Sequence, residues 1–219
     1  MVHRTPFFLP ILYPSLTWRM PPETNTLYLT FDDGPVPGPT EFVLEILNRV
    51  GVKATFFCIG DNIRKHPEIF RNVLGHGHAT GNHTHHHLNG WKTTTNDYYK
   101  NVTRCREEIE AYLSHKHLPQ GPDNYGDLLF RPPFGRVSRN QIKKLQPEYK
   151  IIMWDVLSID YNKNLSGEKC LRNTISASRP GSIVVFHDSY KAEKNLMYAL
   201  PRFVEHFLEM GFDFRVIQG

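Results

Sequence analysis

Two adjacent carboxylates and a run of histidines are the residues of this sequence best suited to chemistry. Asp32 and Asp33 directly follow an apolar segment, and His83 and His87 enclose the run His-Thr-His-His-His. Side chains alternate in direction along a strand, so adjacent aspartates at a strand end can divide labour between binding a cation and moving a proton. Histidines at positions i and i+4 share one face of a helical turn, about 5–6 Å apart at Cβ. Two imidazoles and one carboxylate make a catalytic zinc set that leaves positions for water and substrate.

Each of these patterns also has a simpler interpretation. Asp-Asp-Gly-Pro is typical of a polar turn, and residues 83–87 can form an exposed histidine-rich loop. If His83 and His87 share a helical face, His85 and His86 point elsewhere, toward solvent or substrate. The two patterns together favour a metal site more strongly than either does alone.

Two further residues are candidates for charge stabilisation and proton transfer. Arg131 begins the segment Arg-Pro-Pro-Phe-Gly, and His187 follows the apolar run 183–186. A guanidinium can hold a carboxylate ionised and oriented, although a surface arginine beside a proline turn fits the same pattern. An imidazole with an ordinary pKa near ~6.5 is a natural general acid at neutral pH, although it can equally just cap the strand.

Apolar segments alternate with helical patterns along the whole chain, which predicts a mostly parallel sheet or barrel. The predicted strands are 27–31, 52–59, a short segment before Gly81, 128–130, 149–153, 182–186 and 212–217. The predicted helices are 41–50, segments between 61 and 75, 96–117, 138–145, 166–178 and 195–210. Chemistry in such folds gathers at the carboxyl ends of the strands. Asp32–Asp33, His83–His87, Arg131, Asp160 and His187 each follow a predicted strand, so we expect them to meet.

Composition sets the broad class of the protein. With 219 residues, 40% hydrophobic and 22% charged, the chain fits one globular domain without a signature of disorder. A net charge of +4 without a long Lys/Arg run favours a solvated surface over nucleic-acid binding. Three widely spaced cysteines form neither a disulfide framework nor a thiolate zinc site. We expect no membrane span, because no apolar run approaches the ~18 residues that one requires.

The N-terminal residues are expected to form an irregular extension, 1–25, packed on a domain that spans 26–219. Pro10 and Pro14 interrupt the early apolar run, and no small-residue cleavage site follows it. This gives no convincing signal peptide. A cytoplasmic location is the default expectation, with export as the alternative if a leader has been removed.

Four ordered motifs resemble those of the NodB-homology polysaccharide deacetylases, carbohydrate esterase family 4. They are residues 30–35 (Thr-Phe-Asp-Asp-Gly-Pro), 83–87, 131–134 (Arg-Pro-Pro-Phe) and 185–187 (Val-Phe-His). The resemblance extends over roughly residues 26–217. It implies an α/β fold, an irregular (β/α) barrel of about seven strands in a single domain. It also implies one divalent metal ion, most commonly Zn²⁺, with Co²⁺ and Ni²⁺ as alternatives.

The resemblance also implies roles for individual residues. Asp33, His83 and His87 would be the metal ligands. Asp32 would be the general base, held by Arg131, and His187 the general acid. The substrate-binding residues would be Pro133, Phe134 through its backbone N–H, Val185 in a pocket for the acetyl methyl group, and Tyr161.

One motif departs from the family pattern. Where the family often shows Asp-x-x-Asp-Trp, this sequence has Leu157, Asp160 and Tyr161. The retained Asp160 is expected to orient Arg131 or to tune His187, as part of the catalytic set. The replacements Leu157 and Tyr161 put the fit of the substrate in doubt more than the catalysis.

The implied activity is hydrolysis of N-linked acetyl groups on N-acetylglucosamine-containing poly- or oligosaccharides, of the chitin-oligosaccharide or peptidoglycan type, by a monomer. One alternative is an amidohydrolase that acts on a non-sugar amide, but such relatives commonly alter the Asp-Asp pair, which is intact here. A non-catalytic carbohydrate-binding relative would have lost a base, an acid or a ligand, and a structural metal protein would need a filled coordination shell.

Overall fold

The strands of the protein form one curved sheet in the computed structural model, which describes residues 3–22, 24–113 and 128–219. The strands are β1 (Thr26–Asp32), β2 (Thr55–Cys58), β3 (Ala79–Asn82), β4 (Leu128–Phe130), β5 (Tyr149–Ile151), β6 (Val156–Leu157), β7 (Ile183–His187) and β8 (Asp213–Phe214). Their order is β5-β4-β3-β2-β1-β7-β6, with β8 beside the start of β1, and the paired strands are parallel. The carboxyl ends of the strands therefore share one rim.

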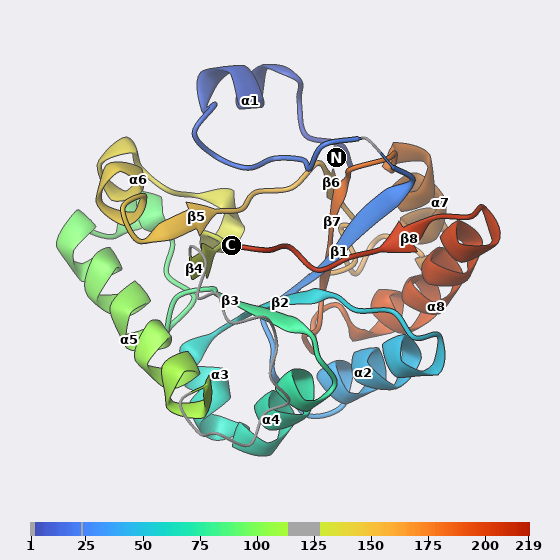
Figure 1. The fold of residues 1–219 in the computed structure, drawn as a ribbon, viewed down its shortest axis with the longest axis horizontal. Helices are drawn as coiled ribbons and strands as arrows, with labels where there is room; N and C mark the ends of the chain where they lie inside the picture. The colour runs from blue at the N-terminus through green and yellow to red at the C-terminus, as the bar shows by residue number, and fades with distance from the viewer. Residues whose placement is uncertain (1–2, 23, 114–127) are drawn as a thin grey trace.

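Helices cover the outer, convex side of this sheet (Figure 1). The helices of the described residues are α1 (Phe8–Leu12), α2 (Pro39–Arg49), α3 (Gly60–Lys65), α4 (Pro67–Gly75), α5 (Thr95–Leu113), α6 (Arg139–Leu145), α7 (Gly167–Ala177) and α8 (Glu193–Glu209), with short 3₁₀ turns at Gly90–Lys92 and Pro133–Gly135. Figure 1 shows α2 to α8 around the sheet, whereas α1 lies apart from them, over the side where β5 and β6 end the sheet. Among the described residues, no helix has both the length and the apolar character that crossing a bilayer requires.

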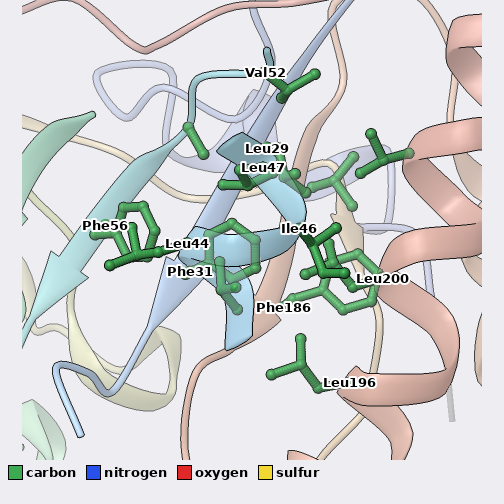
Figure 2. Packing of buried hydrophobic residues seen from close by; sticks show 14 of the residues in the cluster. Leu29, Phe31, Leu44, Ile46, Leu47, Val52, Phe56, Phe186, Leu196 and Leu200 are labelled. Atoms are coloured by element: carbon green, nitrogen blue, oxygen red, sulfur yellow. The ribbon is translucent and has the colours of Figure 1, made fainter. Parts of the chain in front are cut away.

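The main core lies between β1 and its neighbours on one side and α2 and α8 on the other (Figure 2). Phe31 of β1 is fully buried there and stacks on Phe56 of β2, with 5.0 Å between the ring centroids. Burying a side chain of this size contributes about 1.5–3 kcal/mol. Because side chains alternate along a strand, Thr30 and Asp32, the residues on either side of Phe31, face the inside of the barrel. The core thus fixes which face of β1 carries the carboxylate.

The N-terminal segment hydrogen-bonds to both open edges of the sheet. Thr17 donates to the carbonyl of Ile151 beside β5 at 2.9 Å and accepts from the N–H of Met153 at 2.7 Å. Near β6, the N–H of Leu157 donates to the carbonyl of His3 at 2.8 Å. These bonds satisfy backbone groups that an edge strand otherwise leaves unpaired.

The predicted α/β irregular barrel is confirmed, but several predicted elements have different bounds. The strand predicted at 149–153 is present as β5, which ends at Ile151. A separate strand, β6, follows it, and Asp160 comes after β6. The last strand is limited to Asp213–Phe214. The helix predicted at 96–117 is α5, which begins at Thr95, and the predicted residues 114–117 lie outside the described residues.

Candidate active site

A cavity of about 550 Å³ opens at the carboxyl ends of the strands. It is lined by Asp32, Asp33, His83, His87, Phe134, Arg136, Trp154, Leu157, Tyr161, His187 and Lys191. A larger cavity of about 880 Å³ lies beneath the N-terminal extension, but its lining contains no histidine, and its one carboxylate, Asp155, is bound by Arg179. The smaller cavity therefore holds the groups that can do chemistry.

Three potential metal ligands converge in this cavity. Oδ1 of Asp33 lies 3.2 Å from Nε2 of His87 and 3.7 Å from Nε2 of His83. One ligand atom from each of the three residues lies within 4.8 Å of the other two. Ligands at about 2.1 Å in a tetrahedral shell are separated by roughly 3.4 Å, so the spacing of the three donors fits a single small cation.

His83 is held in the form that a metal requires. Its ring Nδ1 hydrogen-bonds to the backbone carbonyl of Arg131 at 2.8 Å, which places the proton on Nδ1 and leaves the Nε2 lone pair facing Asp33. Burial lowers the pKa of His83 to about 4, so the imidazole is neutral at physiological pH. A neutral ring with a fixed tautomer is ready to bind a cation.

The two histidines meet through a loop and not through a helix, which corrects the sequence-based expectation. Residues 83–87 are irregular after β3, and Thr84 and His87 have positive φ angles of 63° and 53°. Left-handed conformations are rare and costly for non-glycine residues, and they cluster at functional sites. The loop therefore folds back so that His87 returns to the cavity beside His83, with 5.1 Å between their ring centroids.

His85 was expected to point toward solvent or substrate, and this was wrong. Its side chain is fully buried, and a Cβ built on Gly60 would lie 2.6 Å from its ring Nδ1 and 3.0 Å from Cα of Cys105. His86 is exposed, and its Nδ1 lies 2.9 Å from Nδ2 of Asn101. The directions predicted for the side chains of residues 83–87 assumed a helical turn, and this loop is not helical.

Asp33 leaves the path of β1 because its backbone turns into the left-handed region, with φ of 84°. The amide of Asn62 donates to its carbonyl at 2.7 Å. Burial raises the pKa of its carboxyl, but the hydrogen bond from His87 and the charge of His187 outweigh burial and hold that pKa well below its usual value. Asp33 is accordingly an ionised ligand.

Asp188 supports the turn that carries Asp33. Its Oδ1 accepts from the N–H of Gly34 at 3.0 Å, and its Oδ2 is 2.7 Å from the hydroxyl of Thr40. A Cβ on Gly34 would lie 1.9 Å from Oδ2 of Asp188, so only glycine fits there. Burial raises the pKa of Asp188 to about 8.

Asp32 faces the same cavity as Asp33 but has a different partner. Its Oδ1 accepts from Nη1 of Arg131 at 2.7 Å, and its Oδ2 is 4.0 Å from Nε2 of His83. The Arg131 side chain is fully buried, donates to Thr30 Oγ1 at 2.8 Å, and lies 4.0 Å from the centre of the Phe57 ring. The predicted division of labour between the two aspartates therefore corresponds to two different sets of contacts.

His187 and Asp160 form a second pair beside Asp32, because His187 of β7 is the register partner of Asp32 of β1. The carboxylate of Asp160 contacts the ring Nδ1 of His187 at 2.7 Å through Oδ1 and accepts from its backbone N–H at 2.8 Å through Oδ2. Burial alone lowers the pKa of His187, but the charge and hydrogen bond of Asp160 raise it to about 9. Of the two expectations for Asp160, contact with His187 is observed, whereas the recorded partners of Arg131 do not include Asp160.

Two predicted substrate residues do not line the cavity. Val185 and Pro133 are buried, although Val185 shares its face of β7 with His187. Phe134 does line it, with its ring 4.5 Å from that of His87, and Tyr161 lies edge-on to His187 at 5.0 Å.

Sequence reasoning missed three lining residues, which are Trp154, Arg136 and Lys191. Their positions in the sequence could have identified them, because each closely follows a predicted strand or a recognised motif. Arg136 lies directly after the Arg-Pro-Pro-Phe-Gly segment, and Lys191 lies four residues after His187.

Comparisons with known proteins give a consistent result. Residues 19–147 match the polysaccharide deacetylase family. A peptidoglycan-N-acetylglucosamine deacetylase of Bacillus cereus is 32% identical over 74% of this chain, which spans 55% of that relative's length. A chitooligosaccharide deacetylase of Bradyrhizobium is 29% identical over 76% of this chain and 72% of that protein.

A solved structure is similar over almost the whole chain. The Bc1960 peptidoglycan N-acetylglucosamine deacetylase, in complex with a 4-naphthalen-1-yl-N-oxidanyl-benzamide, aligns with a TM-score of 0.83. The identity is 28%, and the alignment covers 97% of this chain and 95% of the other. The arrangement of strands and helices is thus the one found in that protein.

Proposed function

Because this chain belongs to the polysaccharide deacetylase family, we propose that it is a metal-dependent hydrolase that removes N-linked acetyl groups from N-acetylglucosamine-containing poly- or oligosaccharides. The observation that carries the proposal is the convergence of Asp33, His83 and His87 between two charged pairs, Asp32–Arg131 and Asp160–His187. The names of the similar proteins support a substrate of the peptidoglycan or chitin-oligosaccharide type.

Asp33, His83 and His87 would hold one divalent cation. Two imidazoles and one carboxylate suit Zn²⁺ in particular, although Co²⁺ and Ni²⁺ accept the same ligands. When bound, such an ion lowers the pKa of a water molecule toward ~7 and polarises a carbonyl oxygen. The protein supplies the geometry for this chemistry through the fixed tautomer of His83 and the turn that holds Asp33.

Asp32 would act as the general base. Its Oδ1 is bound by Arg131, so Oδ2, which faces His83, is the oxygen available to accept a proton from the attacking water. The guanidinium fixes the orientation of the carboxylate. Arg131 therefore acts through Asp32 and without contact to the substrate.

His187 would act as the general acid. Its Nδ1 is held by Asp160, so its Nε2 is free to face the cavity and give a proton to the departing amine. The raised pKa of His187, about 9, keeps the ring protonated at neutral pH. Protonation of the nitrogen is needed for C–N cleavage, which releases acetate and a free amino sugar.

The remaining substrate contacts are proposed from their positions. The Phe134 backbone N–H would donate to the developing oxyanion, a contribution of about 3 kcal/mol for one good donor. Pro133 would hold Phe134 in place, and Tyr161 would contact the sugar beside His187.

Acetate release from chitin oligosaccharides and peptidoglycan fragments tests the proposal directly. We expect turnover that a chelator removes and added Zn²⁺ restores. Asp33→Ala should lose metal binding and turnover together, whereas His187→Ala should retain the metal and lose most of the turnover. Unchanged turnover in His187→Ala would reject the acid assignment, and full activity with chelator would reject the metal.

A non-sugar amide is the principal alternative substrate class, and a non-catalytic carbohydrate-binding protein is the other. Hydrolysis of a purine-derived or cyclic amide without acetate release would favour the former, and glycan binding without any turnover the latter. The complete set of proposed ligands, base and acid favours the deacetylase. The expected monomer can be checked by light scattering.

A further inference from the structure

Two cationic side chains flank the mouth of the candidate active site. Arg136 and Lys191 both line the cavity and are both exposed. From their position we propose that the protein selects glycans that carry carboxylate groups on or next to the N-acetylated sugar, over neutral chitin-type glycans. This inference rests on the proposed function and names the substrate class of the same site.

The two cations stand on opposite sides of the metal ligands. Arg136 follows β4, and Lys191 follows β7, with β3, β2 and β1 between those strands in the sheet. The neighbours confirm the separation: Phe134, two residues before Arg136, lies against His87, whereas Tyr161, which lies beneath Lys191, packs against His187. A glycan bound across the cavity therefore meets one cation on each side of the sugar that reacts.

Aromatic rings hold both cations in place. The guanidinium of Arg136 lies 5.2 Å from the ring centre of Trp91, whose indole N–H is fixed by the carbonyl of Val137 at 3.3 Å. The ammonium of Lys191 lies 5.2 Å from the ring centre of Tyr161. Contacts of this kind attract the cation and limit its freedom, which lowers the entropy lost when an anion binds.

Neither carboxylate of the cavity wall pairs with these two cations. Among the described residues that line the cavity, Asp32 and Asp33 are the acidic ones, and they are directed to Arg131 and to the two histidines. Arg136 and Lys191 have no recorded ion pair within the described part of the chain. Their positive charge is therefore available to an external anion, and a carboxylate is an anion that a guanidinium can bind in two-point geometry.

Three tetrasaccharides of matched length test the proposal. They are a neutral N-acetylglucosamine tetramer, a peptidoglycan-type tetramer with lactyl carboxylates and no peptides, and the same acidic tetramer with its carboxylates converted to methylamides. A fourth arm, the acidic tetramer with peptide stems, distinguishes carboxylates on the sugar from carboxylates on a peptide. We expect kcat/KM for the acidic tetramer to exceed the values for the neutral and amidated tetramers at low salt, and the preference to shrink at high salt.

Substitutions assign the preference to the two side chains. Arg136→Gln and Lys191→Gln should each lower the ratio of acidic to neutral kcat/KM about threefold, as expected for partly exposed charge pairs. Arg139→Gln and Lys144→Gln are matched controls, because both cations lie over tyrosine rings, Tyr13 and Tyr99, and neither lines the cavity. The control variants should keep the ratio of the parent protein.

Binding to the metal-free protein, followed by tryptophan fluorescence, to which Trp154 in the cavity wall contributes, separates the two proposals. If no glycan is deacetylated but the acidic tetramer still binds more tightly, the proposed function fails and the selectivity stands. If turnover occurs with equal kcat/KM for all tetramers, or if the Gln variants keep the ratio of the parent, the selectivity is overturned while the deacetylase remains.

Discussion

Asp160 holds His187 at two points, with one carboxylate oxygen on the ring Nδ1 at 2.7 Å and the other on the backbone N–H at 2.8 Å. This contact raises the pKa of His187 to about 9. The protonated ring is thus present below that pH and is lost above it. The same shift stabilises the fold fully below the unfolded value of about 6.5 and ceases to do so as pH rises through about 9.

We predict that kcat/KM for deacetylation falls as pH rises through about 9, and that Asp160→Asn moves this alkaline limb to lower pH, because the neutral amide no longer favours the imidazolium. The measurement is a pH profile of acetate release. Asp155→Asn is the control, since Asp155 is an equally buried carboxylate that contacts Arg179 and Ser182 away from the cavity. An unchanged limb in Asp160→Asn would contradict the assignment of His187.

Arg131 should be essential for stability as well as for activity. Arg131→Met leaves the buried carboxylate of Asp32 without its cation, and breaking a buried pair in this way costs about 3–5 kcal/mol. Chemical denaturation should show this loss in the free energy of unfolding. The double variant Asp32→Asn/Arg131→Met should be more stable than Arg131→Met alone, because no uncompensated charge remains. Equal stability of the single and double variants would argue against the pairing.

Gly34 should tolerate no side chain. Gly34→Ala places a methyl group 1.9 Å from Oδ2 of Asp188, so the turn that carries Asp33 must shift. We expect metal affinity to drop at least about tenfold, the scale for disturbing the groups that orient a ligand. Gly75→Ala is the matched control, because a Cβ there meets nothing within 4 Å. Isothermal titration with Zn²⁺ measures both variants, and equal affinities would refute the role of the Gly34–Asp188 contact.

Removal of the metal should lower thermal stability together with activity. A ligand present at a hundred times its Kd stabilises the folded state by about 2.7 kcal/mol. A chelator should therefore lower the Tm of the parent protein. Asp33→Asn should show a Tm that the chelator does not change, because the ligand set is already incomplete. A chelator effect of equal size in both proteins would mean that the ion binds elsewhere.

Most of the fold and of the site could be predicted from the sequence. The reason is that the apolar residues of each strand both form the core and determine which residues lie at the carboxyl end of that strand. Leu29 and Phe31 define the buried face of β1, and the strand ends at Asp32. Alternating apolar runs and helical patterns were enough to place Asp32, His83, Arg131 and His187 at neighbouring strand ends, and the structure confirms that they lie there.

The parts that could not be predicted depend on backbone conformations without a periodic pattern. The path of residues 83–87 follows from left-handed angles at Thr84 and His87, and a His-x-x-x-His spacing fits a helix equally well. Strand β6 has two residues, Val156 and Leu157, too few for any alternation to show. Residues at the mouth of the cavity, such as Lys191, are placed there by the paths of loops, and the spacing of residues in the sequence does not predict these paths.

The hydrogen bonds that the N-terminal segment makes to β5 and β6 have a consequence for the solution behaviour of the protein. An open curved sheet otherwise offers two outer strands onto which a strand of another molecule can add. His3 and Thr17 occupy those positions from within the same chain. The segment thus blocks intermolecular strand pairing at these two edges, and its detachment would expose backbone groups onto which a strand of another molecule can add.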